Sequence, residues 1–130
     1  MAILKTKCEC GQSVQANVGD RIYNNRLYWF QSYYCDNCNG AIEMDGDGEI
    51  PPAIKSAILE QEGSFGLFLN DLKDRAKTEF LLKKIPSDYL IMFELFLNKR
   101  SDEIIRGTQN EVLLVKNYLK TKGAIDCKIK

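Results

Sequence analysis

The sequence predicts an α+β protein in which a β-rich N-terminal part with two cysteine pairs precedes a region of alternating strands and helices. Two observations carry this prediction. Four of the five cysteines lie within the first 38 residues, in two close pairs. From residue 64 onward, apolar residues recur at spacings of two and of three to four, as strands and helices require. With 130 residues, 45% of them hydrophobic and 28% charged, the chain is long enough for one ordinary domain or two small ones.

The chain divides by composition into three segments. We expect a small β domain over residues 1–48, a linker with a connecting helix over 49–63, and an α+β domain over 64–130. Residues 1–50 carry four basic and seven acidic side chains, a net charge of −3, and the remainder carries +3. A dense basic footprint of the kind that binds phosphates is not visible, so a nucleic-acid role is disfavoured.

Neither a membrane anchor nor an export signal is visible in the sequence. The longest charge-free aromatic stretch, Leu27–Cys35, is far shorter than the roughly 20 residues that span a bilayer. No apolar run follows Lys5 and Lys7. We therefore expect a cytoplasmic protein.

The two cysteine pairs have the spacing of a zinc ribbon. Cys8 and Cys10 form a Cys-x-Cys pair, Cys35 and Cys38 form a Cys-x-x-Cys pair, and 24 residues separate the two. Residues that permit the tight turns of metal-binding knuckles follow each pair, namely Gly11, Asn39 and Gly40. Four thiolates fill a zinc coordination shell and leave no position for water or substrate, so we expect a structural zinc ion.

Cysteines have uses other than zinc binding. Two disulfides are disfavoured because no secretory signal is visible, and a redox pair formed by Cys35 and Cys38 is the remaining alternative. Cys127 lies far along the chain on a predicted strand. We expect it to be a buried core thiol, with a fifth metal ligand or a redox site as the alternative.

Between the cysteine pairs, period-two patterns predict strands at Ser13–Val18 and Leu27–Tyr34. Turn residues cluster at Gly19-Asp20 and at Asn24-Asn25. Alternation along the second strand places aromatic residues on both faces, with Tyr28, Phe30 and Tyr34 on one and Trp29, Gln31 and Tyr33 on the other. One face is expected to pack within the protein and the other to meet a different domain, a partner protein or stacked bases.

The acidic, glycine-rich residues 45–49 lie where the β domain meets the linker, and we interpret them as a solvated hinge. A calcium loop is the alternative, but the glutamate and the spacing of an EF-hand do not follow. Pro51 and Pro52 then open a helix that Gly63 ends. Its apolar stripe consists of Ile54, Ala57 and Ile58.

The pattern of residues 64–130 predicts the order strand, helix, helix, strand, helix, strand. The first strand covers Phe65–Leu69, and Asn70 caps a helix whose apolar face we assign to Leu72, Ala76, Phe80 and Leu81. Ser87 caps the second helix, whose strongly apolar part is Tyr89–Leu97.

A strand at Glu103–Arg106 and a capping box at Thr108–Glu111 follow. The box opens a helix that ends at Gly123, with its inward positions at Val112, Val115 and Leu119. The final strand alternates Ile125, Cys127 and Ile129 with polar residues.

This order of elements resembles the C-terminal domain of the bacterial ribosomal stalk protein. The resemblance covers about half of the chain and is most visible from Glu103–Thr108 through Lys120–Ala124 to Lys130. In the stalk family, a lysine-bearing, Gly-Leu-rich turn between the first two helices docks translation factors. Here that position reads Lys84–Asp88 and lacks the motif. The resemblance thus implies the β-α-α-β-α-β fold and not the function.

The whole chain is also similar to small bacterial zinc-ribbon proteins of the toxin-immunity type. The matching residues are a Tyr-Cys-x-x-Cys ribbon, an Ile-Glu-x-Asp-Gly segment, a Pro-Pro helix start and a Glu-Gly-x-aromatic segment, at Tyr34–Cys38, Ile42–Gly46, Pro51-Pro52 and Glu62–Phe65. The resemblance implies that the chain neutralises a bacterial toxin by binding it.

The residues themselves favour a binding module over an enzyme. The chain has no histidine, which removes the commonest acid–base group. An acidic surface with aromatic residues suits a basic protein partner, such as a toxic nuclease domain. We assign candidate partner contacts to Trp29, Tyr33, Asp36, Asp45 and Asp47. The alternative is a ribosome- or nucleic-acid-associated zinc ribbon, which would use Lys5, Lys7, Arg21 and Arg26 with the aromatic residues.

Overall fold

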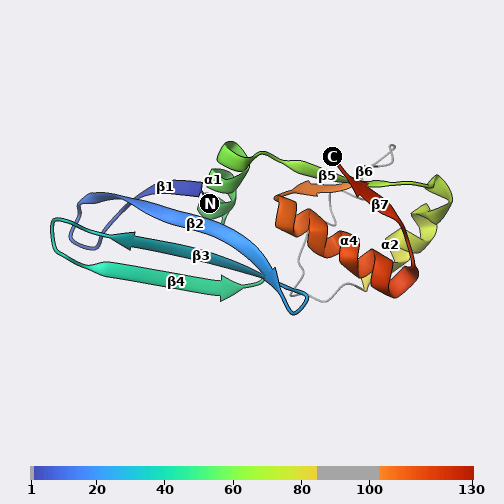
Figure 1. The fold of residues 1–130 in the computed structure, drawn as a ribbon, viewed down its shortest axis with the longest axis horizontal. Helices are drawn as coiled ribbons and strands as arrows, with labels where there is room; N and C mark the ends of the chain where they lie inside the picture. Colours follow the sequence, from blue (N-terminus) through green and yellow to red (C-terminus); the bar gives the residue numbers. More distant parts are fainter. Residues whose placement is uncertain (1, 85–102) are drawn as a thin grey trace.

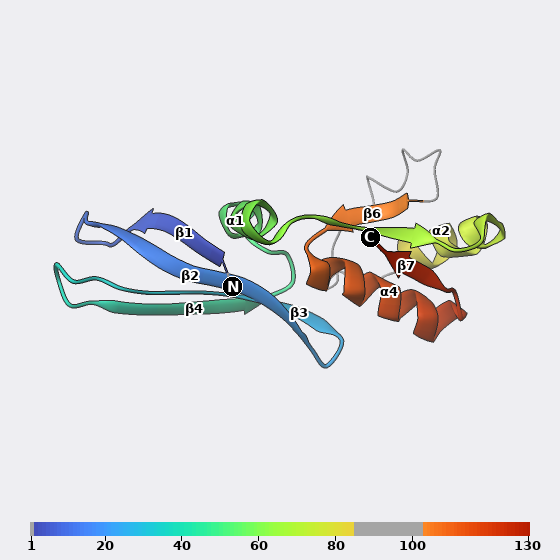
Figure 2. The ribbon, with the colours of Figure 1, turned by 45° about the horizontal axis from the view of Figure 1, so that its top comes forward.

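The computed structural model describes residues 2–84 and 103–130, which form two antiparallel sheets and their helices (Figure 1). The first sheet has the strand order β1-β2-β3-β4 and is a meander. Its strands are β1 (Ala2–Lys7), β2 (Ser13–Tyr23), β3 (Arg26–Tyr34) and β4 (Ala41–Asp47). Helix α1 (Pro52–Glu62) follows and covers one face of this sheet (Figure 2). The predicted α+β class is confirmed.

The second sheet has the order β6-β5-β7, with the first strand along the chain at its centre. Its elements are β5 (Phe65–Leu69), the 3-10 turn η1 (Leu72–Asp74), α2 (Arg75–Lys83), β6 (Glu103–Gly107), α4 (Gln109–Gly123) and β7 (Cys127–Ile129). The helix expected at Tyr89–Leu97, with its cap at Ser87, lies outside the described residues. No helix within the described ranges is long and apolar enough to cross a membrane.

Two glycines that we expected in a turn and in a hinge lie inside strands instead. β2 continues through Gly19-Asp20, and Gly19 pairs with Phe30 of β3. The Phe30 ring lies over Gly19, where an added Cβ would be only 2.7 Å from the ring. Gly46 of β4 accommodates the ring of Trp29 in the same way, again at 2.7 Å. These glycines therefore make room for aromatic rings. The turn predicted at Asn24-Asn25 is confirmed, with φ angles of 51° and 61° that suit a tight hairpin.

Two apolar clusters stabilise the described part of the chain. The first lies between the first sheet, α1 and the first half of α4, and its buried members are Ala2, Ala16, Val18, Leu27, Ile50, Ile54, Ala57, Ile58 and Leu114. The second lies between the second sheet, α2 and α4, with buried members that include Leu67, Leu69, Leu82, Ile104, Val112, Leu119, Ile125 and Cys127. The stripe predicted for α1 and the buried thiol of Cys127 are confirmed.

Helix α2 turns inward only part of the face that its sequence suggested. Leu81 packs against the second cluster as predicted, and Thr78 and Leu82 are buried, whereas Leu72 and Phe80 are 61% and 57% exposed. Asp71 rather than Asn70 provides the cap, accepting a hydrogen bond from the backbone N–H of Lys73 at 2.9 Å. The segment starts with a 3-10 turn, which has fewer residues per turn than an α-helix, and this rotates the helix face that follows.

Helix α4 begins at the predicted capping box and ends at Gly123, as predicted. Thr108 accepts a hydrogen bond from the backbone N–H of Glu111, whose carboxylate accepts one from the backbone N–H of Thr108. At the other end, Ala124 rather than Gly123 takes the left-handed conformation, with φ of 52°. Gly123 is needed for close packing, since a Cβ there would lie 2.5 Å from a methyl carbon of Leu81. The last strand is shorter than predicted and starts at Cys127.

A polar junction at the start of α4 links the two sheets. Asp20 of β2 accepts a hydrogen bond from the hydroxyl of Thr108 at 2.6 Å and two from the amide of Asn110, at 2.9 Å to its backbone oxygen and 3.1 Å to its carboxylate. Lys55 of α1 forms an ion pair with Glu111 at 3.0 Å. The carboxylate of Asp20 also lies where the helix dipole favours a negative charge.

We predict that Asp20→Ala destabilises the protein by about 1–3 kcal/mol, because the substitution leaves the buried hydroxyl of Thr108 without its acceptor and removes one of the two hydrogen bonds of the Asn110 amide. Urea denaturation followed by circular dichroism measures this change. Asp45→Ala, which removes an exposed carboxylate from the same sheet, is the matched control and should have little effect. Equal stability of the two variants would contradict the role given to the junction.

Candidate metal centre

The two cysteine pairs lie in the two hairpin turns at one end of the first sheet (Figure 1). Cys8 and Cys10 occupy the turn between β1 and β2, and Cys35 and Cys38 occupy the turn between β3 and β4. A four-stranded meander places its first and third turns at the same end. The four sulfur atoms consequently lie within 4.8 Å of one another.

The distances between the sulfur atoms fit a tetrahedral metal ion. The Sγ atoms of Cys8 and Cys38 are 3.6 Å apart, and those of Cys10 and Cys35 are 3.7 Å apart. A disulfide bond would require about 2.05 Å. Four sulfur atoms bound tetrahedrally at about 2.3 Å from an ion are separated by about 3.8 Å. All four residues are free cysteines in this geometry, and together they could hold one metal ion.

Local backbone structure turns both loops into knuckles around the sulfur cluster. In the first knuckle, the N–H of Gly11 donates to the carbonyl of Cys8 at 2.8 Å, and Gly11 has φ of 92°. In the second, the N–H of Cys35 donates to the carbonyl of Gly40 at 2.8 Å, and Asn39 has φ of 59°. The left-handed conformations predicted at Gly11 and Asn39 are therefore present.

Gly40 is needed for a different reason from the one that the sequence suggested. Its φ does not lie in the left-handed region. A Cβ at this position would lie 3.2 Å from the Sγ of Cys38. Glycine is therefore favoured at this position because it leaves space for the sulfur atom, and its backbone conformation does not require a glycine.

Polar groups around the cluster differ between the thiols. The side-chain amide of Asn37 donates to the Sγ of Cys10 at 3.5 Å, and this bond, with a backbone bond from Gln12, lowers the pKa of Cys10 to about 6. At Cys38 the backbone N–H of Gly40 opposes the effect of the three neighbouring thiols, which together raise its pKa to about 12. The thiolate of Cys10 therefore forms easily, whereas deprotonation of all four cysteines needs a positive charge among the sulfur atoms.

Tyr33 and Trp29 lie on the covered face of the first sheet, where both pack against its apolar cluster. Tyr33 also reaches the metal centre, where its hydroxyl forms a hydrogen bond with Cys8. Burial, together with this hydrogen bond, raises the pKa of the Tyr33 hydroxyl. The sequence favours partner binding for Tyr33 and indicates no role for Asn37, because only the register of β3 and the shape of the second knuckle show that both side chains border the sulfur atoms.

The three acidic candidates for partner binding are exposed and lie apart from these aromatic side chains. Asp36 lies in the second knuckle, and Asp45 and Asp47 lie on β4. By alternation, Asp45 and Asp47 point to the face opposite Trp29 and Tyr33. The five candidates therefore do not form one surface.

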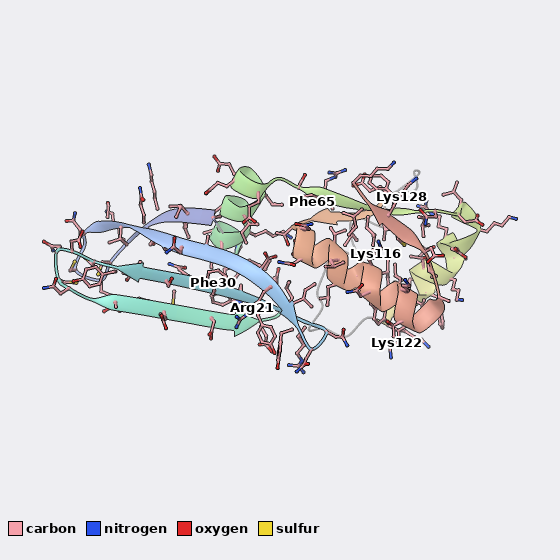
Figure 3. The ribbon with its side chains drawn as sticks, viewed as in Figure 1. Arg21, Phe30, Phe65, Lys116, Lys122 and Lys128 are labelled. Carbon is pink, nitrogen blue, oxygen red and sulfur yellow. The ribbon has the colours of Figure 1, made fainter. Side chains whose placement is uncertain are left out.

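The face of the first sheet away from α1 carries the other aromatic residues. Tyr28, Phe30 and Tyr34 of β3 lie along its centre, and Tyr34 is 56% exposed. Arg21 of β2 is the cross-strand partner of Tyr28 and lies near Phe30 along the sheet (Figure 3). On either side, this face carries Lys5 and Lys7 of β1 and Glu43, Asp45 and Asp47 of β4. We call this surface the open face.

Comparisons with protein-family profiles, with curated proteins and with solved structures find no match for this chain. The resemblances to the ribosomal stalk domain and to toxin-immunity proteins therefore stay predictions. Function has to be argued from the metal centre and the open face.

We predict that the metal-loaded protein has no fast-reacting thiol. Four thiols are engaged by the ion, and burial raises the pKa of the fifth, Cys127, to about 11, so that it stays protonated near neutral pH. Titration with a chromogenic disulfide reagent at pH 8 should release four thiols after a chelator is added and the fifth only in denaturant. A fast-reacting thiol in untreated protein would contradict this assignment.

Proposed function

We propose that the chain is a non-catalytic protein-binding module whose N-terminal sheet is held by one structural zinc ion. The observation that carries the metal assignment is the set of four sulfur atoms, at distances that match a tetrahedral shell. Tetrahedral sites made of four thiolates take zinc or iron. Zinc is the proposed ion because it is the usual occupant of paired cysteine knuckles and needs no redox partner.

A structural role follows from the position of the site. Helix α1 covers the part of the first sheet away from the knuckles (Figure 2). On β3, Leu27 is the buried member of the apolar cluster, and it lies at the opposite end of the strand from Cys35. At the knuckle end, Cys8 and Cys35 are themselves the buried residues. A metal ion joining the two turns replaces the apolar core that this end of the sheet lacks.

We predict that Cys35→Ser removes most of the bound zinc and costs about 3 kcal/mol or more, because one ligand is lost from a site that joins two hairpins. Cys127→Ala is the matched control. It should keep one zinc ion per chain and cost only about 1 kcal/mol. Metal analysis and thermal melting measure both effects. Full zinc content in the Cys35→Ser variant would rule out the four-cysteine site.

The proposal of a non-catalytic role rests on two features. A shell of four thiolates leaves the ion no open position at which to activate water or substrate. The sequence also contains no histidine to act as an acid or base. Reduced cysteines at the surface, Cys10 and Cys38, suit a reducing compartment, which supports a cytoplasmic location.

The open face supports a protein partner. Aromatic side chains with a polar tip, such as Tyr28 and Tyr34, are the residue type that protein interfaces favour. The carboxylates of β4 add negative charge along one side of this face. A basic partner would be steered to such a surface, and toxic nuclease domains are basic because their substrates carry phosphates. Toxin neutralisation is thus the specific form of binding that we propose.

A nucleic-acid role is the second candidate, because the structure places Lys5, Lys7 and Arg21 on the same face as Tyr28 and Phe30. Aromatic platforms flanked by basic residues bind single strands. Against this, the carboxylates of Glu43 and Asp45 share the face and repel phosphates. We therefore favour the protein partner.

We predict that the protein does not bind single-stranded oligonucleotides or heparin at low salt, because the open face lacks an uninterrupted basic surface. If a neighbouring gene encodes a basic nuclease domain, co-expression of this chain should restore the growth of cells that express the domain, and Phe30→Ser should weaken that protection. Fluorescence anisotropy of a labelled oligonucleotide tests the first statement. Tight, steeply salt-dependent oligonucleotide binding that Arg21→Ala abolishes would favour the nucleic-acid role instead.

A further inference from the structure

The two outer strands of the first sheet, β1 and β4, differ in whether a side chain hydrogen-bonds to the backbone groups at their outer edges. At β1, the side-chain amide of Gln61 from α1 takes the place of a neighbouring strand. It accepts a hydrogen bond from the N–H of Ile3 at 2.9 Å and donates one to the carbonyl of Ile3 at 2.6 Å. β4 pairs with β3 on one side, and no strand among the described residues pairs with its other side.

The hydrogen-bond pattern shows which backbone groups β4 presents at its free edge. The N–H of Cys35 donates to the carbonyl of Gly40, and the N–H of Gly48 donates to the carbonyl of Leu27, which fixes the phase of the ladder. Hydrogen-bonded pairs alternate along antiparallel strands. The even-numbered residues of β4 therefore bond to β3, and the backbone groups of Ala41, Glu43, Asp45 and Asp47 point outward.

The same residues set the charge along this edge. Glu43, Asp45 and Asp47 project onto the open face, on the side where an added strand would lie. Asp47 forms an ion pair with Arg26 at 3.1 Å, whereas Glu43 and Asp45 have no ion-pair partner among the described residues. On the other face, Met44 is 45% exposed. β4 spans 7 residues, with continuous register and no proline.

From these observations we infer that β4 binds a partner by strand addition, and that the occupant is an extended segment in which basic and apolar residues alternate. The backbone groups of the odd-numbered residues hydrogen-bond to that segment. Its lysine or arginine side chains lie beside Glu43 and Asp45, and its apolar side chains lie beside Met44. This inference rests on the proposed protein-binding function and specifies the partner segment and the mode of binding.

The charges also argue against self-association through this edge. Two copies of β4 that pair with each other place carboxylates beside carboxylates, which is unfavourable. Pairing of β4 with β1 of a second copy would use Lys5 and Lys7, but Gln61 already occupies the backbone of Ile3 on that edge. A basic strand from another protein meets neither obstacle.

The test uses a fluorescein-labelled peptide of alternating lysine and valine with the 7-residue length of β4. We expect saturable binding to the zinc-loaded protein and none of a matching glutamate–valine peptide. Two further peptides carry backbone N-methyl groups on the lysines or on the valines. Since alternate N–H groups point to opposite edges of a strand, one methylated peptide should lose about tenfold or more in affinity and the other should bind normally.

Protein variants locate the binding site. Glu43→Lys with Asp45→Lys should weaken binding about tenfold or more through charge reversal. Asp45→Pro removes one outward N–H without affecting the ladder to β3, and it should weaken binding more than Asp45→Asn does. Glu60→Lys, an exposed change on α1, is the control and should leave affinity unchanged. Zinc content and melting temperature confirm that each variant is folded.

Three results would overturn the inference. They are equal binding of both methylated peptides, unchanged affinity of the edge variants, and self-association that Lys5→Glu with Lys7→Glu abolishes. The proposed function can survive such a failure. Loss of toxin protection on Phe30→Ser, together with full protection by the edge variants, would leave the protein-binding role to the open face and reject strand addition.

Discussion

The first sheet depends on the four-cysteine cluster, which joins the β1–β2 turn to the β3–β4 turn at the end of the sheet that α1 does not cover. In water, a sheet end without an apolar core has little to offset the conformational entropy of its turns. Cys8 and Cys35 are buried there only because four sulfur atoms converge. A metal ion that joins both turns fixes the β1–β2 hairpin against the β3–β4 hairpin. The pairing of β3 with β2 across the Asn24-Asn25 turn, and with β4, sets the position of every aromatic side chain on the open face, and an ion at the other end would hold the two hairpins in this arrangement.

The position of the first sheet against α4 depends on the polar junction at the start of that helix. Asp20 accepts hydrogen bonds from Thr108 and Asn110, and Lys55 neutralises the buried Glu111. These contacts attach the first sheet to α4 by the face that also carries Trp29 and Leu27, so the opposite face stays uncovered by described residues. The metal centre and the polar junction thus act together. One holds the far end of the sheet, and the other decides which face is available for binding.

Local signals predicted much of this structure. The cysteine spacing predicted the knuckles, Pro51-Pro52 and Gly63 predicted the limits of α1, and the box at Thr108 predicted the start of α4. The predictions were wrong at positions whose role depends on contacts with residues far away in the sequence. The sequence favours a turn at Gly19 and a hinge at Gly46, although each glycine accommodates a ring from a neighbouring strand. Trp29 and Tyr33 could be assigned to one face by alternation, but only the packing of α1 and α4 shows that this face is the covered one.

X-ray absorption at the zinc edge, on protein purified without added metal, shows whether a zinc ion joins the two knuckles. We expect one zinc ion per chain with a single shell of four sulfur atoms at about 2.3 Å and no nitrogen or oxygen ligand. A shell that includes oxygen or nitrogen would show that at least one of the four cysteines is not a ligand. Protein without zinc, in which the cysteines are paired as disulfides, would contradict the account of the metal centre altogether.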